Sequence, residues 1–453
     1  MGRHAAPRGT ASGPPSPAPR RPASAARHAA SGLRLPRARD LAMLAGMSLL
    51  TGLVVGWYPP AFLGDPSSAV ASTPSGTPSA VVDPPSESRS TAEPATSNSI
   101  EPADSEAPPE RSEPVAFVPE SERRTITIAG VGDILLHKEI IAQAIEDGGG
   151  SPDFRAQLEG IRPLIESADL AVCHLEYPLG SREGPWSAWP DLPSSPPQIA
   201  DAVADIGFDA CSTASNHTLD QGFDGVVSTI DALESAGLAH AGTAVSEADS
   251  DRITMIDVKG VPVALLSYTY GFNGIPRPDD WCCNLIEPGA ITAAAQRARD
   301  AGARIVVVSL HHGEEGVAPP TQAQQETVQE LADSGLVGLV IGHHAHVVQP
   351  VTRVGSMWVA YGHGNLLSAQ SRRDPRSGDG LLTTFTFVEQ ADGTFSGQSA
   401  VGYAIVNEDF PFRIYPVSSD APAGSQSDQT WSRVAEQAQI PGDTSGFELS
   451  TFG

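Results

Sequence analysis

Between residues 125 and 405, short apolar runs rich in β-branched residues alternate with longer segments that have a helical pattern of apolar positions. Short apolar runs bounded by turn residues are typical of buried strands, and the longer pattern is typical of helices. Strands alternating with helices, followed by further strands, indicate an α/β layered fold whose central strands are covered on both faces. The predicted strands are 125–133, 170–176, 208–217 with its terminal loop, 253–258, 261–270, 305–310, 336–342, 357–362, 381–390 and 396–405, and the predicted helices lie before 165 and at 199–206, 220–236, 287–301 and 321–334.

Residues 41–58 carry no charge, and eight arginines and a single acid, Asp40, precede them. Eighteen helical residues, at about 1.5 Å each, just span the hydrocarbon layer of a bilayer. The basic flank predicts a cytoplasmic N-terminus and an exported remainder, with 41–58 as a single-pass transmembrane helix in the cell membrane. A cleaved signal peptide is the rival interpretation, because Ala69-Val70-Ala71 has an A-x-A pattern, and a buried core helix is a further alternative.

The composition shifts along the chain predict its organisation. Residues 1–40 read as a basic, disordered cytoplasmic segment, and 64–122 as an extended linker rich in Pro, Ser and Glu. We expect the folded domain to span 123–415 and the polar segment 416–453 to be a poorly ordered tail.

The chain has 28 Lys and Arg against 54 Asp and Glu, a formal net charge of −26. This balance excludes a general nucleic-acid binder, because a polyanion would be repelled without a basic surface. An acidic polymer would have to bind through a metal centre or a local arginine group such as Arg353, Arg372 and Arg373.

Four cysteines in a chain of this length exclude a disulfide scaffold. Cys173 and Cys211 lie on predicted strands and could pair if those strands are neighbours, although two buried thiols fit equally well. For Cys282-Cys283 we expect loop thiols, with a vicinal disulfide as the alternative.

Polar residues of the types that bind metals follow five of the predicted strands. Ligands of open α/β sheets bind beyond the carboxyl ends of the strands, so we expect these side chains to converge. Carboxylate, amide oxygen and imidazole together suit Mn, Fe or Zn better than Ca or Mg. A bridging carboxylate could hold two ions about 3.5–4 Å apart, as in metal-assisted phosphoryl hydrolysis. The residues are Asp133, Glu176, Asn216 with His217, His311 with His312, and His343, His344 and His346.

Taken singly, most of these positions also have an ordinary interpretation. Asp133 after Gly132 could be a turn residue or helix cap, and Asn216 could cap the helix that follows it. Glu176 could be a solvated loop acid. It is their joint placement at strand ends that favours a metal site.

Six segments resemble, in sequence and in order, the capsule-synthesis CapA family. That family is associated with poly-γ-glutamate capsule production and looks like a branch of the calcineurin-like metallophosphoesterases. The resemblance covers about 125–368 and implies a metallophosphoesterase-like sandwich of two β-sheets flanked by helices. The segments are GVGDILL (130–136), CHLEYPLG (173–180), STASNHTLDQG (212–222), SLHHGEE (309–315), IGHHAHVVQP (341–350) and YGHGNLL (361–367).

The resemblance implies a role for each candidate residue. Asp133 is similar to the first metal ligand, Glu176 to the bridging acid, and Asn216 to a ligand through its amide oxygen. His217 would be the general acid or transition-state stabiliser, with Asp220 orienting it. The remaining implied ligands are His311, His312, His344 and His346, with His343 behind them and the order among 343, 344 and 346 left open.

The chain departs from the family pattern at several positions. Leu135 stands where the wider superfamily has a ligand histidine, and His174 stands where the CapA family commonly has asparagine. His312 replaces a frequent tryptophan, and Ala345 replaces proline. These departures bear on how many metal ions the site would hold.

The resemblance implies a protein of capsule, poly-γ-glutamate or related envelope polymer synthesis, and the predicted transmembrane helix makes it membrane-anchored and extracytoplasmic. We expect a phosphoesterase-like hydrolase or a transferase that depends on one or two Mn, Fe or Zn ions and acts on an anionic polymer or phosphoester. Membrane-embedded polymer synthase subunits are the expected partners. The alternative is a non-catalytic metal-binding component of a polymer synthesis or export complex.

Overall fold

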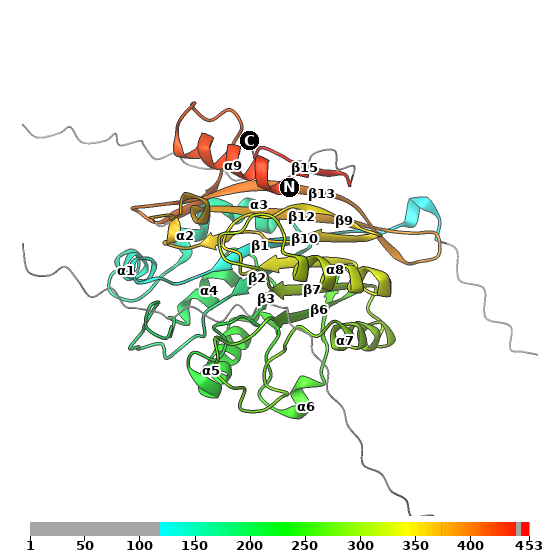
Figure 1. Ribbon diagram of the computed structural model, residues 1–453, viewed down its shortest axis with the longest axis horizontal. Coiled ribbons are helices and arrows are strands. Elements are labelled where there is room, and N and C mark those ends of the chain that lie inside the picture. The colour runs from blue at the N-terminus through cyan, green and yellow to red at the C-terminus, as the bar shows by residue number, and fades with distance from the viewer. Residues whose placement is uncertain (1–117, 373, 441–444, 453) are drawn as a thin grey trace, which may run out of the picture. The chain divides into compact units, whose positions relative to one another are not determined.

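The computed structural model describes residues 118–372, 374–440 and 445–452 (Figure 1). The predicted basic segment, the apolar segment 41–58 and nearly all of the linker lie outside the described residues, so these remain predictions. Within the described ranges, no helix combines the length and the apolar character needed to cross a bilayer.

Helices and strands alternate through most of the described chain. The helices are α1 (Lys138–Asp147), α2 (Arg155–Leu158), α3 (Arg162–Glu166), α4 (Gln198–Asp205), α5 (Gly222–Ser235), α6 (Glu247–Ser250), α7 (Pro288–Asp300), α8 (Gln322–Ser334) and α9 (Gln426–Ala438). The strands are β1 (Thr125–Ile134), β2 (Leu170–Leu175), β3 (Ala210–Ser212), β4 (Ala239–Ala241), β5 (Thr254–Val258), β6 (Val261–Thr269), β7 (Ile305–His311), β8 (Leu339–His343), β9 (Val351–Val354), β10 (Met357–Ala360), β11 (Asn365–Leu367), β12 (Asp379–Glu389), β13 (Phe395–Glu408), β14 (Arg413–Pro416) and β15 (Phe447–Leu449).

The described strands form two sheets. The larger has the order β14-β13-β12-β1-β2-β3-β4, with β11 beside β1 and β15 beside β13, and the smaller has the order β5-β6-β7-β8-β10-β9. Strands β1 to β4 run parallel to one another, as do β6, β7 and β8. Each sheet therefore collects the carboxyl ends of its parallel strands at one edge, and both edges contribute to the site described below.

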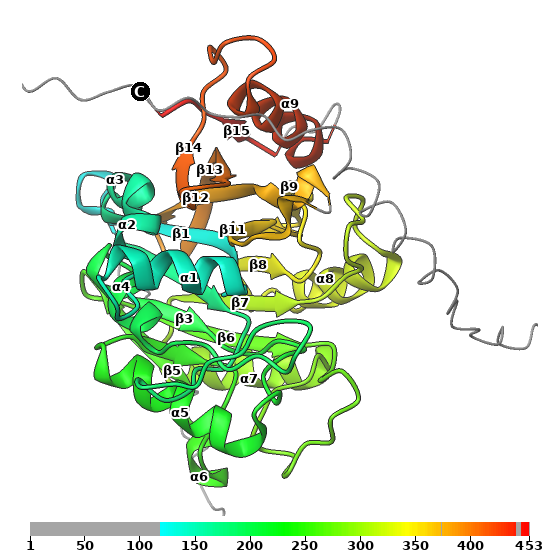
Figure 2. The same ribbon diagram turned by 90° about the vertical axis from the view of Figure 1, so that its left-hand side faces the viewer.

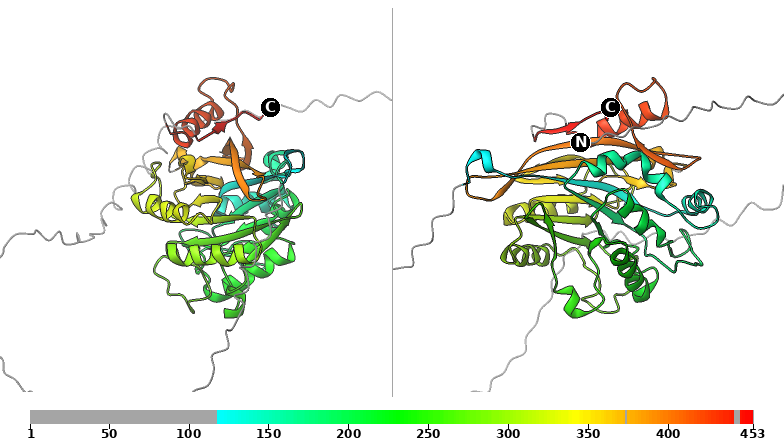
Figure 3. Two further views of the ribbon diagram at one scale, coloured as in Figure 1. Left: turned by 90° about the vertical axis from the view of Figure 1, so that its right-hand side faces the viewer. Right: turned by 180° about the vertical axis from the view of Figure 1, so that it is seen from behind.

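Helices cover the outer face of each sheet, and the apolar core is layered accordingly (Figures 2 and 3). Ile128 and Val172 of the larger sheet face Val307 of the smaller one in the layer between the sheets. The neighbouring positions Ala129 and Ala171 point to the other side, into the layer under α1 to α5. A third apolar layer lies between the smaller sheet and helices α7 and α8. The predicted α/β class, with two sheets flanked by helices, is confirmed.

The segment after residue 416 differs from the expected tail. Helix α9 begins after Ser425, whose side chain accepts a hydrogen bond from the backbone of Asp428. Its buried positions Thr430, Val434 and Ala438 are four residues apart, which gives one apolar stripe. Strand β15 pairs with β13, and α9 and β15 lie over that strand in Figure 1. The expectation of a poorly ordered tail was wrong here. The buried stripe of α9 is short and consists mostly of small residues, so the sequence pattern did not reveal the helix.

The cysteines fall into two groups. Cys173 and Cys211 lie opposite each other on β2 and β3 and form a disulfide, with their Cα atoms 4.4 Å apart. Cys282 and Cys283 are buried free thiols in the loop after β6. The disulfide thus joins the two strands whose ends carry Glu176 and Asn216.

Candidate metal centre

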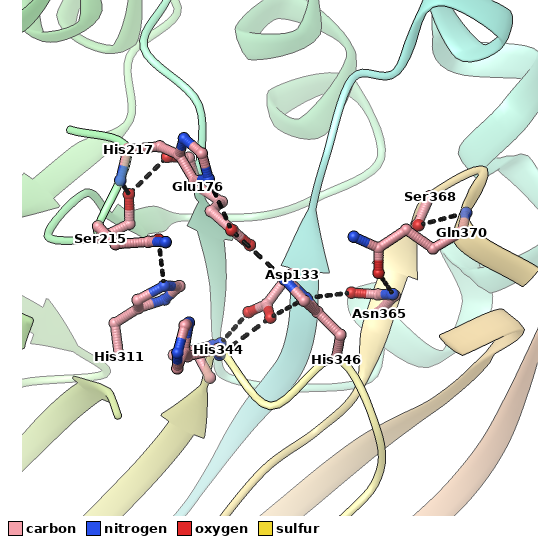
Figure 4. Close-up of polar contacts among 12 residues, drawn as sticks. Asp133, Glu176, Ser215, His217, His311, His344, His346, Asn365, Ser368 and Gln370 are labelled. Carbon is pink, nitrogen blue, oxygen red and sulfur yellow. Dashed lines mark hydrogen bonds and ion pairs between the residues drawn. The ribbon is translucent and has the colours of Figure 1, made fainter. Parts of the chain in front are cut away.

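Asp133, at the end of β1, is fully buried and lies at the middle of a group of imidazoles (Figure 4). Its Oδ1 lies 2.9 Å from Nδ1 of His343, and its Oδ2 accepts a hydrogen bond of 3.0 Å from the backbone N–H of His344. The Nδ1 of His346 lies 3.2 Å from the same Oδ2. Burial raises the pKa of Asp133, but the His343 and His346 hydrogen bonds lower it more, so this carboxylate stays charged.

Glu176, in the loop directly after β2, is equally buried, but no hydrogen bond from a described residue stabilises its carboxylate. Neither carboxylate oxygen has a hydrogen-bond partner among the described residues. The nearest cationic atoms are Nε2 of His346 at 3.6 Å and Nε2 of His217 at 3.9 Å, both measured to Oε1. Burial raises the pKa of Glu176 to about 8. With this pKa, Glu176 keeps a proton near neutral pH in the metal-free site, and a divalent cation can take the place of that proton.

Asn216 and His311 come from the two different sheets and meet at a distance of 2.8 Å between Oδ1 and Nε2. Asn216 follows β3 and His311 ends β7. The ring of His344 lies 4.8 Å from that of His311 and 4.6 Å from that of Tyr270, and its Nδ1 has no partner within the described structure. Burial lowers the pKa of His344 to about 4, so its ring nitrogens are free to act as ligands.

The loop after β8 holds its imidazoles in an unusual backbone conformation. His344 has φ of 85° and His346 has φ of 53°. Left-handed backbone is uncommon for residues other than glycine and marks sites where the surrounding structure imposes it. In this loop it lets the backbone of His344 and the ring of His346 reach the same carboxylate, that of Asp133.

The residues present fit a divalent metal. Two sets of three ligand atoms lie within 4.8 Å of one another, namely Asp133, Glu176 and His346, and Asp133, His174 and His343. The first set consists of predicted ligands, with Asn216 and His311 close by. Buried carboxylate, imidazole and amide oxygen match the preferences of Mn, Fe or Zn. This agreement of donor type, burial and unpartnered oxygens supports the metal prediction for the site.

Asn365, which sequence reasoning missed, fixes the ring of His346. Its Nδ2 donates to the carbonyl of Ser377 at 2.9 Å and to Oε1 of Gln370 at 3.2 Å. Its Oδ1 therefore faces Nδ1 of His346, 3.0 Å away, and accepts the proton of that nitrogen. The other ring nitrogen, Nε2, is left to face Glu176 and to bind a metal (Figure 4). The sequence signal was the YGHGNLL segment itself, one of the six that carry the resemblance, which contains Asn365.

His217 lies at the rim of this cluster, as predicted from its position after Asn216. Its Nδ1 lies 2.5 Å from Oδ2 of Asp220, and its Nε2 faces Glu176. Burial lowers the pKa of His217, but the Asp220 hydrogen bond and the charge of Glu176 raise it more, and the net shift is upward. Asp220 therefore orients His217 and favours its protonated form, as a general acid requires.

Two aromatic side chains border His217 on the open side. The ring of Tyr177 lies 4.9 Å away, and that of Trp189, which is 47% exposed, lies 6.2 Å away. Trp186 instead donates its indole N–H to the carbonyl of Ser181 and packs within its own loop. Of the two tryptophans in this loop, only Trp189 is placed to contact a substrate.

Two sequence predictions receive no support from the geometry. The ring of His312 belongs to neither set of closely spaced donor atoms, and its Nδ1 has no partner in the described residues. Arg353, expected to attract an acidic polymer, donates to the carbonyls of Gly397 and Gln398 and stacks on Trp358, so its charge serves the fold. Arg373 and the side chain of Arg372 lie outside the described structure.

Two imidazoles beyond the predicted ligands complete the buried cluster. His174 and His343 stack with ring centroids 4.0 Å apart, and His343 contacts Asp133. His174 could have been found from the sequence, because it lies two residues before Glu176 and side chains at this spacing share one face of a strand. His343 was left open between ligand and supporting residue, and its contact with Asp133 places it beside the carboxylate.

Comparison with known families and proteins bears on this site. The family described as bacterial capsule synthesis protein PGA_cap matches residues 127–370, which include every candidate site residue. The capsule biosynthesis protein CapA of Bacillus anthracis is 27% identical over 58% of this chain, and the PGA biosynthesis protein CapA of Bacillus subtilis is 23% identical over 58%. The chain spans 64% and 68% of the lengths of these relatives.

Similar solved structures include the calcineurin-like phosphoesterase YfkN from Bacillus subtilis, at 12% identity and a TM-score of 0.38, covering 69% of this chain and 98% of that one. The NAD nucleotidase NadN of Haemophilus influenzae has 10% identity and a TM-score of 0.39, covering 73% and 65%. Likeness at these TM-scores carries no argument about activity.

Proposed function

The chain belongs to the PGA_cap family of bacterial capsule synthesis proteins, and from this premise we propose that it is a metal-dependent hydrolase or transferase in envelope polymer synthesis. Its substrate in this proposal is anionic, a phosphoester or a polymer of the poly-γ-glutamate type. Its partners would be membrane-embedded subunits of the polymer synthase.

The observation that carries the proposal is the buried carboxylate of Glu176, which has no hydrogen-bond partner and faces two histidines. A structural carboxylate would be paired, because the interior of a protein penalises an unpaired one. At this position the carboxylate can hold a cation, with Nε2 of His217 beside it at 3.9 Å. The arrangement is that of a metal ligand with an acid catalyst next to it.

Each side chain has a defined task in this proposal. Asp133, His346 and Glu176 would hold one metal ion, and Glu176, Asn216, His311 and His344 would hold a second. When bound, such ions supply Lewis-acid polarisation of a phosphoryl or carbonyl oxygen. His217, oriented by Asp220, donates its Nε2 proton to the leaving oxygen. Tyr177 and Trp189 shield the open side of His217 from water.

The proposal also includes location. Residues 41–58 would anchor the chain in the cell membrane with the described domain outside, carried by the acidic linker. Protease added to intact cells should then remove the domain and spare the N-terminal segment. A domain that is degraded only after the cells are lysed would contradict this topology.

Two substitutions test whether the site is catalytic. His217→Ala should retain the metal and lower the turnover of a phosphodiester substrate by about 10²–10⁴-fold, the usual contribution of general acid–base catalysis. Asn216→Ala should lose metal. His240→Ala is a matched control, because His240 is a buried histidine outside the site.

Polymer production in a deletion strain decides between an enzyme and a non-catalytic component. If His217→Ala restores polymer production as well as the wild type while Asn216→Ala does not, the metal is structural and catalysis is excluded. If both variants fail although each is folded and exported, the enzyme proposal holds.

A further inference from the structure

His174 is a fully buried histidine beneath the site, and both of its ring nitrogens have a partner. Its Nδ1 lies 2.8 Å from Oγ of Ser212, and its Nε2 lies 3.0 Å from Nδ1 of His311. Ser212 is the residue directly opposite His174 in the register of β2 and β3. A chain of polar contacts therefore runs from β3 through β2 to the end of β7, which belongs to the other sheet.

The Asn216 end of this chain sets the direction of its hydrogen bonds in the metal-free protein. Nε2–H of His311 donates to Oδ1 of Asn216, because an amide oxygen can only accept. Nδ1 of His311 then accepts from Nε2–H of His174, and Nδ1 of His174 accepts from the hydroxyl of Ser212.

A metal ion on Nε2 of His311 requires these hydrogen bonds to reverse. Nδ1–H of His311 then donates to Nε2 of His174, and Nδ1–H of His174 donates to Oγ of Ser212. The hydroxyl of Ser212 can turn to the carbonyl oxygen of Cys173, 3.3 Å away, which can only accept. Imidazole nitrogen and amide oxygen are both ligands that a divalent ion of the Mn, Fe or Zn type accepts. The chain therefore lets His311 carry its proton on Nδ1 and bind a metal through Nε2 without leaving a buried polar atom unpaired.

We infer that His174 is a positioning residue, which with Ser212 orients His311 and accepts a hydrogen bond from its Nδ1 when Nε2 binds a metal ion. The inference rests on the proposed function, because it assumes that the site takes a metal. His174 is not itself a ligand, since both of its nitrogens are already engaged. Its ring is held flat against that of His343, at an interplanar angle of 17°, which prevents it from turning away from His311.

The test measures the affinity of the full-length protein for Mn²⁺ and Zn²⁺ alone by titration calorimetry. His174→Leu should weaken binding by about 10–100-fold, the usual effect of removing a group that supports a metal ligand. His174→Gln should retain most of the affinity, because a glutamine can place an amide oxygen where Nε2 accepted from His311. Ser212→Ala should give a smaller loss in the same direction.

Ser309→Ala is the matched control. Ser309 is another fully buried serine, it lies on β7 two residues before His311, and its hydroxyl has no partner among the described residues. Its removal should leave metal affinity unchanged. The thermal midpoints of the metal-free variants show whether each one folds.

A second measurement does not depend on metal. The ¹⁵N shifts of His311 in the metal-free protein should show a proton on Nε2, and His174→Leu should weaken that preference because it removes the donor to Nδ1. If His174→Leu binds metal within twofold of the wild type, or if its His311 keeps the wild-type tautomer preference, the inference is wrong. If the wild-type protein itself binds neither ion, the proposed metal site fails instead.

Discussion

Two buried acids of the larger sheet, Asp379 at the start of β12 and Glu176 after β2, have opposite environments. Asp379 accepts hydrogen bonds from Oγ1 of Thr430 at 2.7 Å and from Nε and Nη2 of Arg433 at 2.5 and 2.7 Å. These partners come from α9, so the ion pair fastens that helix to the sheet. Glu176 is as deeply buried and has no hydrogen-bond partner among the described residues.

The difference separates a structural carboxylate from a functional one. A folded protein tolerates a buried charge when another of its side chains neutralises that charge, as Arg433 does for Asp379. At Glu176 the chain supplies histidines at 3.6 Å and beyond but no hydrogen bond. We therefore expect substitutions of the two acids to differ in their effects on stability, on metal affinity and on the pH dependence of stability.

The largest effect on stability should come from the structural acid. Asp379→Ala leaves Arg433 without its partner at a mostly buried position, so the free energy of unfolding should fall by about 3 kcal/mol. Urea denaturation of the full-length protein measures this. Metal affinity should stay unchanged, and a loss of metal affinity in a folded Asp379→Ala protein would remove the distinction between the two acids.

The largest effect on metal binding should come from the functional acid. Glu176→Gln keeps the size of the side chain but removes the charge, so metal affinity should fall by at least about 100-fold, the upper end of what supporting residues contribute. The metal-free variant should be more stable than the wild type near neutral pH, because the raised pKa of Glu176 shows that the folded state disfavours its charged form. A large destabilisation without loss of metal would show that Glu176 is structural.

The metal-free protein should lose stability as the pH rises. The pKa of Glu176 is raised to about 8 by burial, and that of His346 is raised to about 10 by Glu176 and Asp133 against the effect of burial. Both groups therefore bind protons more tightly in the folded state than in the unfolded one, so the unfolding free energy falls as pH increases from about 4.5 to 10.

Bound metal should reverse this trend, because it displaces those protons and its affinity therefore rises with pH. Unfolding experiments from pH 5 to 9, with and without Mn²⁺, measure both slopes. In Glu176→Gln the metal-free slope below pH 8 should flatten, and an unchanged slope would place the titrating group elsewhere.

The smallest effect concerns a partnered acid near the start of β1. Arg124 holds Glu389 through a bidentate contact and lowers the pKa of that carboxyl to about 2. Its contribution is complete above the ordinary pKa of glutamate and is lost as the pH falls from about 4.5 to 2. Because Arg124 is 40% exposed, Glu389→Gln should cost only about 1 kcal/mol near neutral pH, and nothing near pH 2.

Much of the site could be predicted because its residues follow apolar strands. Asp133, Glu176 and His311 each come at the end of a run whose pattern predicts a buried strand, and parallel strands bring such ends together. Strands β5 and β6 and the helices α4, α5, α7 and α8 were predicted for the same reason. Apolar periodicity is strong in all of these segments.

The rest could not be predicted because short or polar segments carry little periodicity. Strands β4, β9 and β11 have three or four residues each, and their pairing depends on neighbours that are distant in the sequence. Asn365 belongs to one of these strands, so its contact with His346 was missed. The resemblance implied both His312 and His311 as ligands, although only one of two adjacent residues usually faces a given side.

The most direct test of the central claim is the metal content of purified full-length protein, measured by elemental mass spectrometry alongside Glu176→Gln and Asp379→Asn. We predict one or two equivalents of Mn, Fe or Zn in the wild type and in Asp379→Asn, and a loss of metal in Glu176→Gln. A wild-type protein that carries no transition metal and takes up none on titration would contradict the account. Equal metal content in all three proteins would contradict the role given to Glu176.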